Sequence, residues 1–89
     1  MAFEVLISKE AQIELDIAVC FFKIKALDDQ FLSDFNQQLK FLKTSPFLFQ
    51  KRYREIRILL FAEFNYSIHY FIENDKVKTL RILNQSQDF

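Results

Sequence analysis

The densest group of anion-binding side chains occurs in the middle of the chain, together with one aromatic residue. It consists of Lys51, Arg52, Tyr53, Arg54 and Arg57. A guanidinium group can bind a phosphate through two parallel hydrogen bonds, and a neighbouring ring can stack on a nucleobase. Alternation along an extended chain places Tyr53 and Arg57 on one face and Arg52 and Arg54 on the other. The group therefore predicts a surface for nucleic acid or for an acidic protein; the alternative is a solvated strand edge whose charge prevents edge pairing.

The single histidine and the single cysteine offer little further chemistry. His69 lies in an alternating segment and should face away from the main apolar row, together with Phe71 and, by the same count, Arg57. Proton transfer would require a reacting group beside His69, and a lone histidine on a strand is more often structural. Cys20 has apolar neighbours, which predicts a small buried side chain rather than a nucleophile.

The composition excludes several kinds of site. One cysteine and one histidine exclude an internal disulfide, a cysteine-based zinc cluster and a multi-histidine metal site. Glycine is absent, which excludes a P-loop and a dinucleotide-binding fingerprint, because both need backbone that approaches phosphate without a Cβ. We therefore expect no metal and no cofactor.

Length and charge indicate one globular domain, residues 1–89, with 51% apolar and 27% charged residues. Twelve basic residues balance twelve acidic ones, so the overall charge does not indicate a partner. No segment reaches the roughly 18 apolar residues that span a membrane, and the N-terminal residues lack the basic start of a signal peptide. With a free cysteine, these features predict a cytoplasmic protein that does not bind membranes.

The first half of the chain predicts a short strand and two helices. Residues 3–7 are β-prone, and Ser8 stands at the N-cap position of a helix over residues 9–25. A stripe of Ala11, Leu15, Ala18 and Phe22 should face the core. Four further apolar residues broaden this stripe, so we expect both flanks of the helix to be covered; they are Ile13, Ile17, Cys20 and Ile24.

The second helix should start at Asp28 or Asp29, one of them as N-cap, and end before Pro46. Its apolar stripe consists of Phe31 or Leu32, followed by Phe35, Leu39 and Leu42. Its opposite, solvated side should carry Asp34, Gln37, Gln38 and Lys40. The short connection between the helices predicts an antiparallel helix hairpin.

The second half changes to a period of two, which predicts strands at residues 53–61, 66–73 and 77–83. Ile56, Ile58 and Leu60 form the apolar row of the first of these, and Asn74-Asp75 predicts a tight turn between the other two. The element order is β-α-α-β-β-β. We therefore predict an α+β fold with the helix hairpin packed on one face of an antiparallel sheet.

Five segments in chain order form a pattern that goes beyond periodicity. They are the opening strand and helix ending in Phe21-Phe22, the second helix closing on Ser45-Pro46-Phe47, RYREIR (52–57), FNYSIHYFIENDKV (64–77) and LRILNQSQDF (80–89). Together they resemble the small toxins of bacterial type II toxin–antitoxin modules, the RelE/ParE superfamily, over nearly the whole chain. The resemblance implies the fold predicted above and a toxin of the plasmid-stabilisation kind that a cognate antitoxin neutralises.

Several positions depart from the family pattern. Asn84, Gln87 and Phe89 stand where relatives often carry His, Arg and Pro, and Ser67 stands where ribonuclease members often carry Arg. A phosphodiester-cleaving site without a positioned cation loses much of its electrostatic stabilisation. The departures therefore favour the ParE-like side of the family, whose members bind DNA gyrase and have no hydrolytic site.

Three functions stay open. The first is a ParE-like toxin that binds a large target such as DNA gyrase, and the second is a RelE-like endoribonuclease (an mRNA interferase) that cleaves messenger RNA on the ribosome. The third is a non-toxic relative that serves only in protein interaction. The candidate catalytic residues are Arg57, His69 and Arg81, and the candidate target- or phosphate-binding residues are Lys51, Arg52, Tyr53, Arg54, Arg57 and Arg81. All three functions imply an antitoxin partner, whose usual acidity suits residues 51–57, and they leave a homodimer open.

Overall fold

The computed structural model describes residues 3–85 as an α+β domain, which confirms the predicted class and the helix hairpin. The elements are β1 (Glu4–Ile7), α1 (Lys9–Ile24), α2 (Asp28–Thr44), a 3-10 turn (Pro46–Leu48), β2 (Lys51–Tyr53), β3 (Ile56–Leu60), β4 (Tyr66–Glu73) and β5 (Lys76–Asn84). The strand predicted to start at residue 53 is thus two strands, because a turn at Arg54 and Glu55 separates β2 from β3.

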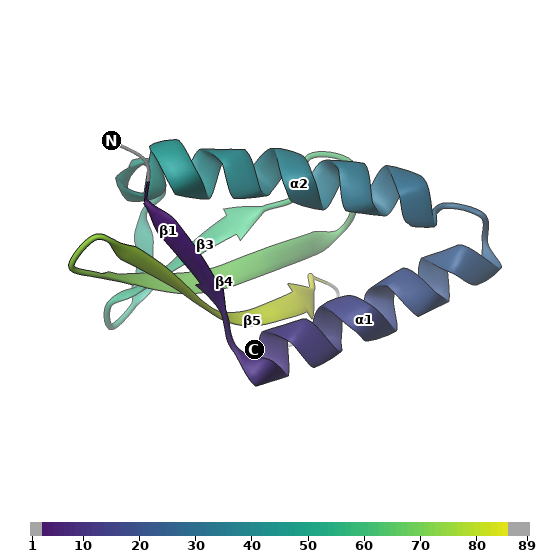
Figure 1. Ribbon diagram of the computed structural model, residues 1–89, viewed down its shortest axis with the longest axis horizontal. Coiled ribbons are helices and arrows are strands. Elements are labelled where there is room, and N and C mark those ends of the chain that lie inside the picture. The colour runs from purple at the N-terminus through teal and green to yellow at the C-terminus, as the bar shows by residue number, and fades with distance from the viewer. Residues whose placement is uncertain (1–2, 86–89) are drawn as a thin grey trace.

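The five strands form one sheet in the order β1-β5-β4-β3-β2. Figure 1 labels β1, β3, β4 and β5 together with the two helices. Neighbouring strands are antiparallel except at one edge, where β1 pairs with β5 in parallel. The predicted antiparallel sheet is therefore correct for β2 to β5 only. A parallel pair needs a crossover connection, and here the whole helix hairpin and the three other strands lie between the two partners.

Ser8 fixes the point at which the chain leaves the sheet and enters α1. Its Oγ accepts a hydrogen bond from the Ala11 backbone N–H at 3.0 Å, as expected of an N-cap. The same hydroxyl donates to the backbone carbonyl of Leu80 on β5 at 2.8 Å. One side chain therefore both starts the helix and attaches that start to the sheet.

The helices are joined by a tight turn in which an alanine takes the conformation that usually requires glycine. Ala26 has φ 58°, and the backbone N–H groups of Ala26 and Leu27 donate to the carbonyls of Lys23 and Phe22. This is the Schellman arrangement that ends many helices, normally with glycine at that position. The predicted N-cap role of Asp28 or Asp29 is wrong: Leu27 occupies the cap, and both aspartates lie in the first turn, where the helix dipole favours them.

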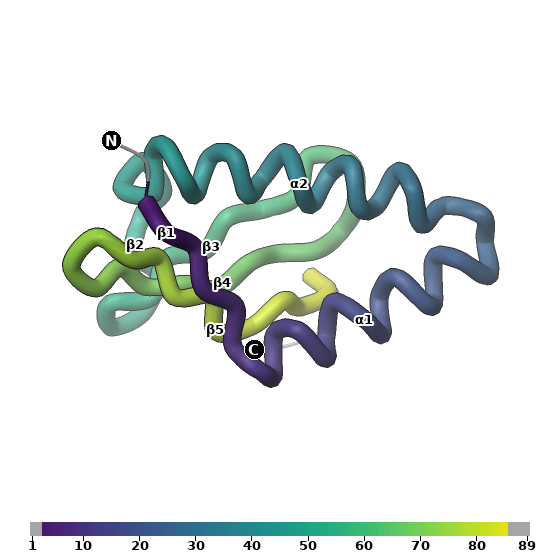
Figure 2. The backbone as a smooth tube through the Cα atoms, viewed as in Figure 1, coloured from purple at the N-terminus to yellow at the C-terminus, as the bar shows by residue number. Residues whose placement is uncertain are grey.

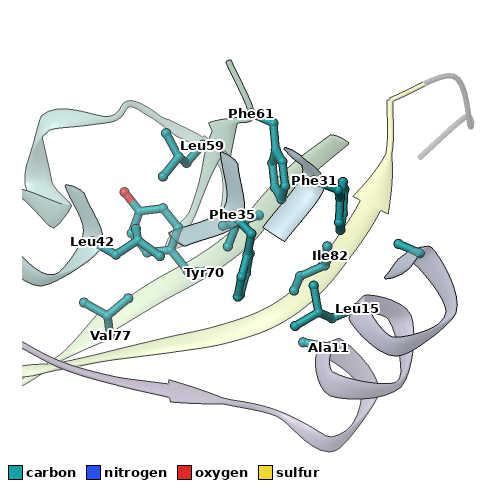
Figure 3. Close-up of a cluster of buried hydrophobic side chains, with 12 residues drawn as sticks. Ala11, Leu15, Phe31, Phe35, Leu42, Leu59, Phe61, Tyr70, Val77 and Ile82 are labelled. Atoms are coloured by element: carbon teal, nitrogen blue, oxygen red, sulfur yellow. The ribbon is translucent and has the colours of Figure 1, made fainter. Parts of the chain in front are cut away.

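The two helices diverge from this turn towards the sheet (Figure 2). Ala11 and Leu15 of α1 lie beside Ile82, whereas Phe35 and Leu42 of α2 lie over the part of the sheet that carries Tyr70 (Figure 3). The Tyr70 hydroxyl donates to the carbonyl of Pro46 at 2.6 Å, and desolvation raises the pKa of Tyr70 to about 12. The core is thus rich in aromatic rings, as a small domain without tryptophan requires.

Two polar residues of α2 that were predicted to be solvated are buried. Asp34 accepts hydrogen bonds from the backbone N–H groups of Ala62, Glu63 and Phe64, and Gln38 donates to it at 2.9 Å. Burial alone would raise the pKa of Asp34, but these hydrogen bonds outweigh burial and hold that pKa below its usual value. Asp34 therefore fixes the β3–β4 connection against α2.

The expectation that both flanks of α1 are covered is wrong. Ala11, Leu15 and Ala18 are buried, but Ile17 is 65% exposed and Ile24 is 84% exposed. Cys20 is also exposed, contrary to the predicted buried thiol. The reason is that, among the described residues, α1 packs along one side only, where it meets β5 and α2. Across residues 3–85, neither helix has the length and apolar character needed to cross a membrane.

Candidate functional site

The face of the sheet opposite the helices carries a cavity of about 340 Å³. It is lined by Arg52, Tyr53, Ile58, His69, Arg81 and Leu83. Strand pairing brings three of them together, since Ile58 is the partner of His69 across β3–β4 and Arg81 is its partner across β4–β5. Four of the residues selected from the sequence therefore line one cavity.

The apolar row predicted for β3 lies on the face of the sheet that points away from the core. Leu59 is buried in the core opposite Ile68, whereas Ile58 faces the cavity and Leu60 is half exposed. The predicted apolar row at Ile56, Ile58 and Leu60 is therefore not the core row. Ile56, Ile58 and Leu60 on one face outnumber Leu59 on the other, which it shares with the charged Arg57, so alternation favoured the wrong face.

His69 is buried at the base of the cavity between two hydroxyl groups. The Tyr53 hydroxyl lies 3.0 Å from Nδ1, and the Ser67 Oγ lies 3.2 Å from Nε2. Ser67 donates its own proton to the carbonyl of Leu83, at 3.4 Å, so its oxygen is left to accept from Nε2–H. The Nε2–H tautomer satisfies this network, because Ser67 then accepts from Nε2–H and Nδ1 accepts the proton of Tyr53.

The electrostatics of the cavity keep His69 neutral. Burial is the main cause that lowers the pKa of His69, the charge of Arg81 lowers it further, and Glu14 acts in the opposite direction. At neutral pH the ring therefore carries no charge, and taking a proton from Tyr53 would create a cation beside Arg81. His69 is therefore better suited to holding the Tyr53 ring, which is 48% exposed, in place than to acting as a general base.

Arg81 is bound within the fold. Its Nε and Nη2 donate to Oε2 of Glu14 at 2.9 and 2.6 Å, and Oε1 of Glu14 accepts the backbone N–H of Ile82 at 2.9 Å. Glu14 raises the pKa of Arg81 by this hydrogen bond, so the guanidinium stays charged but has a counter-ion. The signal for Glu14 in the sequence is weak: it is an acidic residue directly beside the buried stripe of α1.

Arg57 lies on the helix side of the sheet, not in the cavity. It pairs with Tyr70 across β3–β4, its Nη1 donates to the carbonyl of Phe49 at 2.6 Å, and its guanidinium lies 5.3 Å from the centre of the Phe47 ring. The predicted grouping of Arg57 with Tyr53 and His69 is therefore wrong. Alternation fails here because Arg54, with φ 50°, turns the chain between the two strands.

The other members of the basic group differ in how much charge they leave uncompensated. Lys51 pairs with Glu55 at 2.8 Å. Arg52 lines the cavity and Arg54 is exposed in the β2–β3 turn; between Phe3 and Gln85 neither forms an ion pair. Arg52 and Arg54 are thus the cations of the predicted group whose charges are free to meet an anionic ligand.

Some of the positions that depart from the family pattern lie among the described residues. Asn84 ends β5 and forms a hydrogen bond with Tyr66, whose pKa is nevertheless raised by burial. Gln87 and Phe89 lie outside the described residues. Among residues 3–85, no three side chains of His, Cys, Asp or Glu lie close enough together to hold a metal ion.

Comparison with known proteins identifies the fold but not a sequence family. No protein-family model matches the chain, and no curated protein matches it in sequence. A solved structure described as a chromosomal ParDE TA system from P. aeruginosa contains a chain similar to this one. The two chains superpose with a TM-score of 0.76 at 17% identity, over 92% of this chain and 95% of that one. The fold implied by the RelE/ParE resemblance is therefore confirmed.

Proposed function

We propose that this chain is the toxin of a type II toxin–antitoxin pair, that it acts in the cytoplasm in a ParE-like way by binding a large target such as DNA gyrase, and that a cognate antitoxin neutralises it. The observation that carries the proposal is the fold shared along almost the whole chain with a member of a ParDE system. Because proteins with the same fold can differ in function, the mode of action depends on the residues of the site.

The site supports binding more than hydrolysis. Cleavage of a phosphodiester needs cations aimed at the charge that develops in the transition state. Arg57 and Arg81 are held by Phe49 and Glu14, and His69 is buried and neutral. These three candidate catalytic residues therefore do not converge on one point from which they could assist a reaction.

A RelE-like endoribonuclease is the second candidate, and one observation favours it. The Tyr53 hydroxyl, Arg52 and Arg81 line a single cavity on the open face of the sheet. An exposed aromatic ring beside two guanidinium groups suits a stacked base and its phosphate. Under this alternative Tyr53 contacts the substrate and Arg52 binds the phosphate.

The antitoxin in this proposal is an acidic chain that binds at the β2–β3 turn and its surroundings. Arg52 and Arg54 supply uncompensated positive charge there, and the half-exposed Tyr53 and Leu60 supply apolar contact nearby. Interfaces commonly combine arginine with exposed aromatic residues in this way. Co-expression with the product of the neighbouring gene should therefore raise the soluble yield.

Induction of the chain alone in bacteria tests the proposal. We expect growth arrest, a DNA-damage response and intact messenger RNA, and the purified chain should inhibit supercoiling by gyrase. Arg52→Ala should weaken the effect, whereas Lys40→Ala, which removes an exposed charge on α2, should not. Cleavage of messages in codon register, abolished by Tyr53→Phe, would instead establish the ribonuclease. Unimpaired growth would indicate the non-toxic relative.

A further inference from the structure

The outer side of α1 carries a second apolar stripe, directly opposite the one buried in the core. Its members recur at steps of three and four residues, and all five are exposed. They are Ile13, Ile17, Cys20, Phe21 and Ile24. The buried stripe is shifted from them by two positions, which corresponds to about half a turn of helix. Helix α1 is thus apolar on two opposite sides, of which residues 3–85 cover only one (Figure 1).

This stripe is too regular to be a scatter of surface apolar residues. Single exposed apolar side chains are common, but a continuous row along a helix is typical of an interface. The row also runs beside a hollow of about 490 Å³ between α1 and α2, to which Val19, Cys20 and Leu32 contribute. A helix of another chain could therefore pack along α1 with its side chains in this hollow.

The charges beside the stripe indicate what kind of helix would fit. One flank carries Asp16 in the first half of α1 and Lys23 in the second half. The other flank carries Glu10 near the start, and Lys25 directly after the last residue. When two copies of a helix pack antiparallel, the same flank of each helix faces the other. The first half of that flank in one copy then lies beside the second half in the other copy.

We infer that the chain forms a symmetric homodimer in which two α1 helices pack antiparallel through this stripe. Ile17 of one copy then lies opposite Cys20 of the other, and Ile13 lies opposite Ile24. In this register Asp16 approaches Lys23 of the second copy, and Glu10 approaches Lys25. A parallel pair would instead bring Asp16 of one copy towards Glu10 of the other, and Lys23 towards Lys25, so these four charges favour the antiparallel arrangement. The inference does not depend on the proposed function.

The charge pattern provides a specific test. The chain, made by cell-free synthesis to avoid toxicity, should sediment as a dimer that dissociates on dilution through the micromolar range. Asp16→Lys alone and Lys23→Glu alone should each weaken the dimer about tenfold, because each reversal acts twice in a symmetric pair. The double variant Asp16→Lys, Lys23→Glu should restore dimerisation. Residues 16 and 23 are two helical turns apart, so contacts within one copy cannot produce this rescue.

Apolar variants and a crosslink complete the test. Ile17→Ser should abolish the dimer, whereas Leu48→Ser, which changes an equally exposed residue far from α1, should leave it intact. Ile17→Cys should form a disulfide with Cys20 of the second copy under diamide, and Ile24→Cys should not. A chain that is monomeric up to millimolar concentration, failure of the double variant to rescue, or equal effects of Ile17→Ser and Leu48→Ser would overturn the inference.

Discussion

Glu14 on α1 and Arg81 on β5 form an ion pair with a shortest N–O distance of 2.6 Å, and the second oxygen of the same carboxylate accepts the backbone N–H of Ile82. A single acidic side chain therefore attaches the helix to the last strand through both a side chain and the backbone. It also determines which way the guanidinium of Arg81 points and how much charge the cavity presents.

Replacing this carboxylate should weaken the attachment of α1. We expect Glu14→Gln to lower the free energy of unfolding by about 1 kcal/mol, a modest value because the Arg81 side chain is half exposed and its charge is partly screened. Urea denaturation measures the change. Glu63→Gln is the matched control, since Glu63 is exposed, its side chain forms no ion pair among residues 3–85, and its loss of charge should change stability by less than half as much. Equal effects of the two variants would contradict the anchoring role.

The buried His69 should make stability depend on pH. Its pKa in the folded chain lies below the ordinary 6.5, so the unfolded chain takes up the proton first as the pH falls. The free energy of unfolding should therefore be level above pH 6.5 and fall as the pH drops below that value. The carboxylate of Asp34 contributes its own loss only at lower pH, below about its ordinary value of 3.8.

His69→Gln should remove this dependence between pH 6.5 and 4.5 while the fold is retained. Chemical denaturation across that range, followed by circular dichroism, measures the slope. The absolute stability of the variant does not matter to the test, because a structural loss would shift the whole curve without changing its slope. A slope that persists in His69→Gln would show that another group causes it.

Glycine in place of Ala26 should stabilise the turn between the two helices. Ala26 has φ 58°, where a Cβ costs about 1 kcal/mol, and this cost exceeds the extra entropy that glycine gives the unfolded chain. We expect Ala26→Gly to raise the melting temperature by a few degrees. Ala62→Gly, at an exposed residue that is not among those with positive φ, should lower it or leave it unchanged.

Thr79 on β5 carries a hydroxyl that is not satisfied. The residue is buried opposite Tyr70, and within the part of the chain that the structure describes its Oγ1 has no hydrogen-bond partner. Valine has the same shape without the polar group, so Thr79→Val should stabilise the fold by about 1 kcal/mol. Thr79→Ser keeps the hydroxyl and loses the methyl group, and it should destabilise the fold. Thermal unfolding of both variants gives the comparison.

The sequence predicts the features that are set by neighbouring residues. Ser8 and Pro46 mark the start of α1 and the end of α2, and the alternation of residues 66–73 gives β4 its full length. The burial of Asp34 could not be predicted, because its backbone partners lie 28 to 30 residues further along the chain. A polar residue on a helix is read as exposed unless its distant partners are known.

The candidate site shows the same limit. Pairing of β3, β4 and β5 brings His69 and Arg81 together, which follows once the register is known. Alternation gives the wrong face for Arg57, because the chain turns at Arg54 and no glycine marks that turn in the sequence. The sequence predicts that the outer side of α1 is covered, because an apolar pattern does not show whether a helix face is buried in its own fold or exposed.

The parallel pairing of β1 with β5 affects how the chain is made. The two strands are 72 residues apart in sequence, as are Ser8 and its hydrogen-bond partner Leu80. During translation β1 emerges from the ribosome first, yet its place in the sheet does not exist until β5 has followed it. The sheet therefore cannot be completed until β5 has also emerged, long after β1 was made.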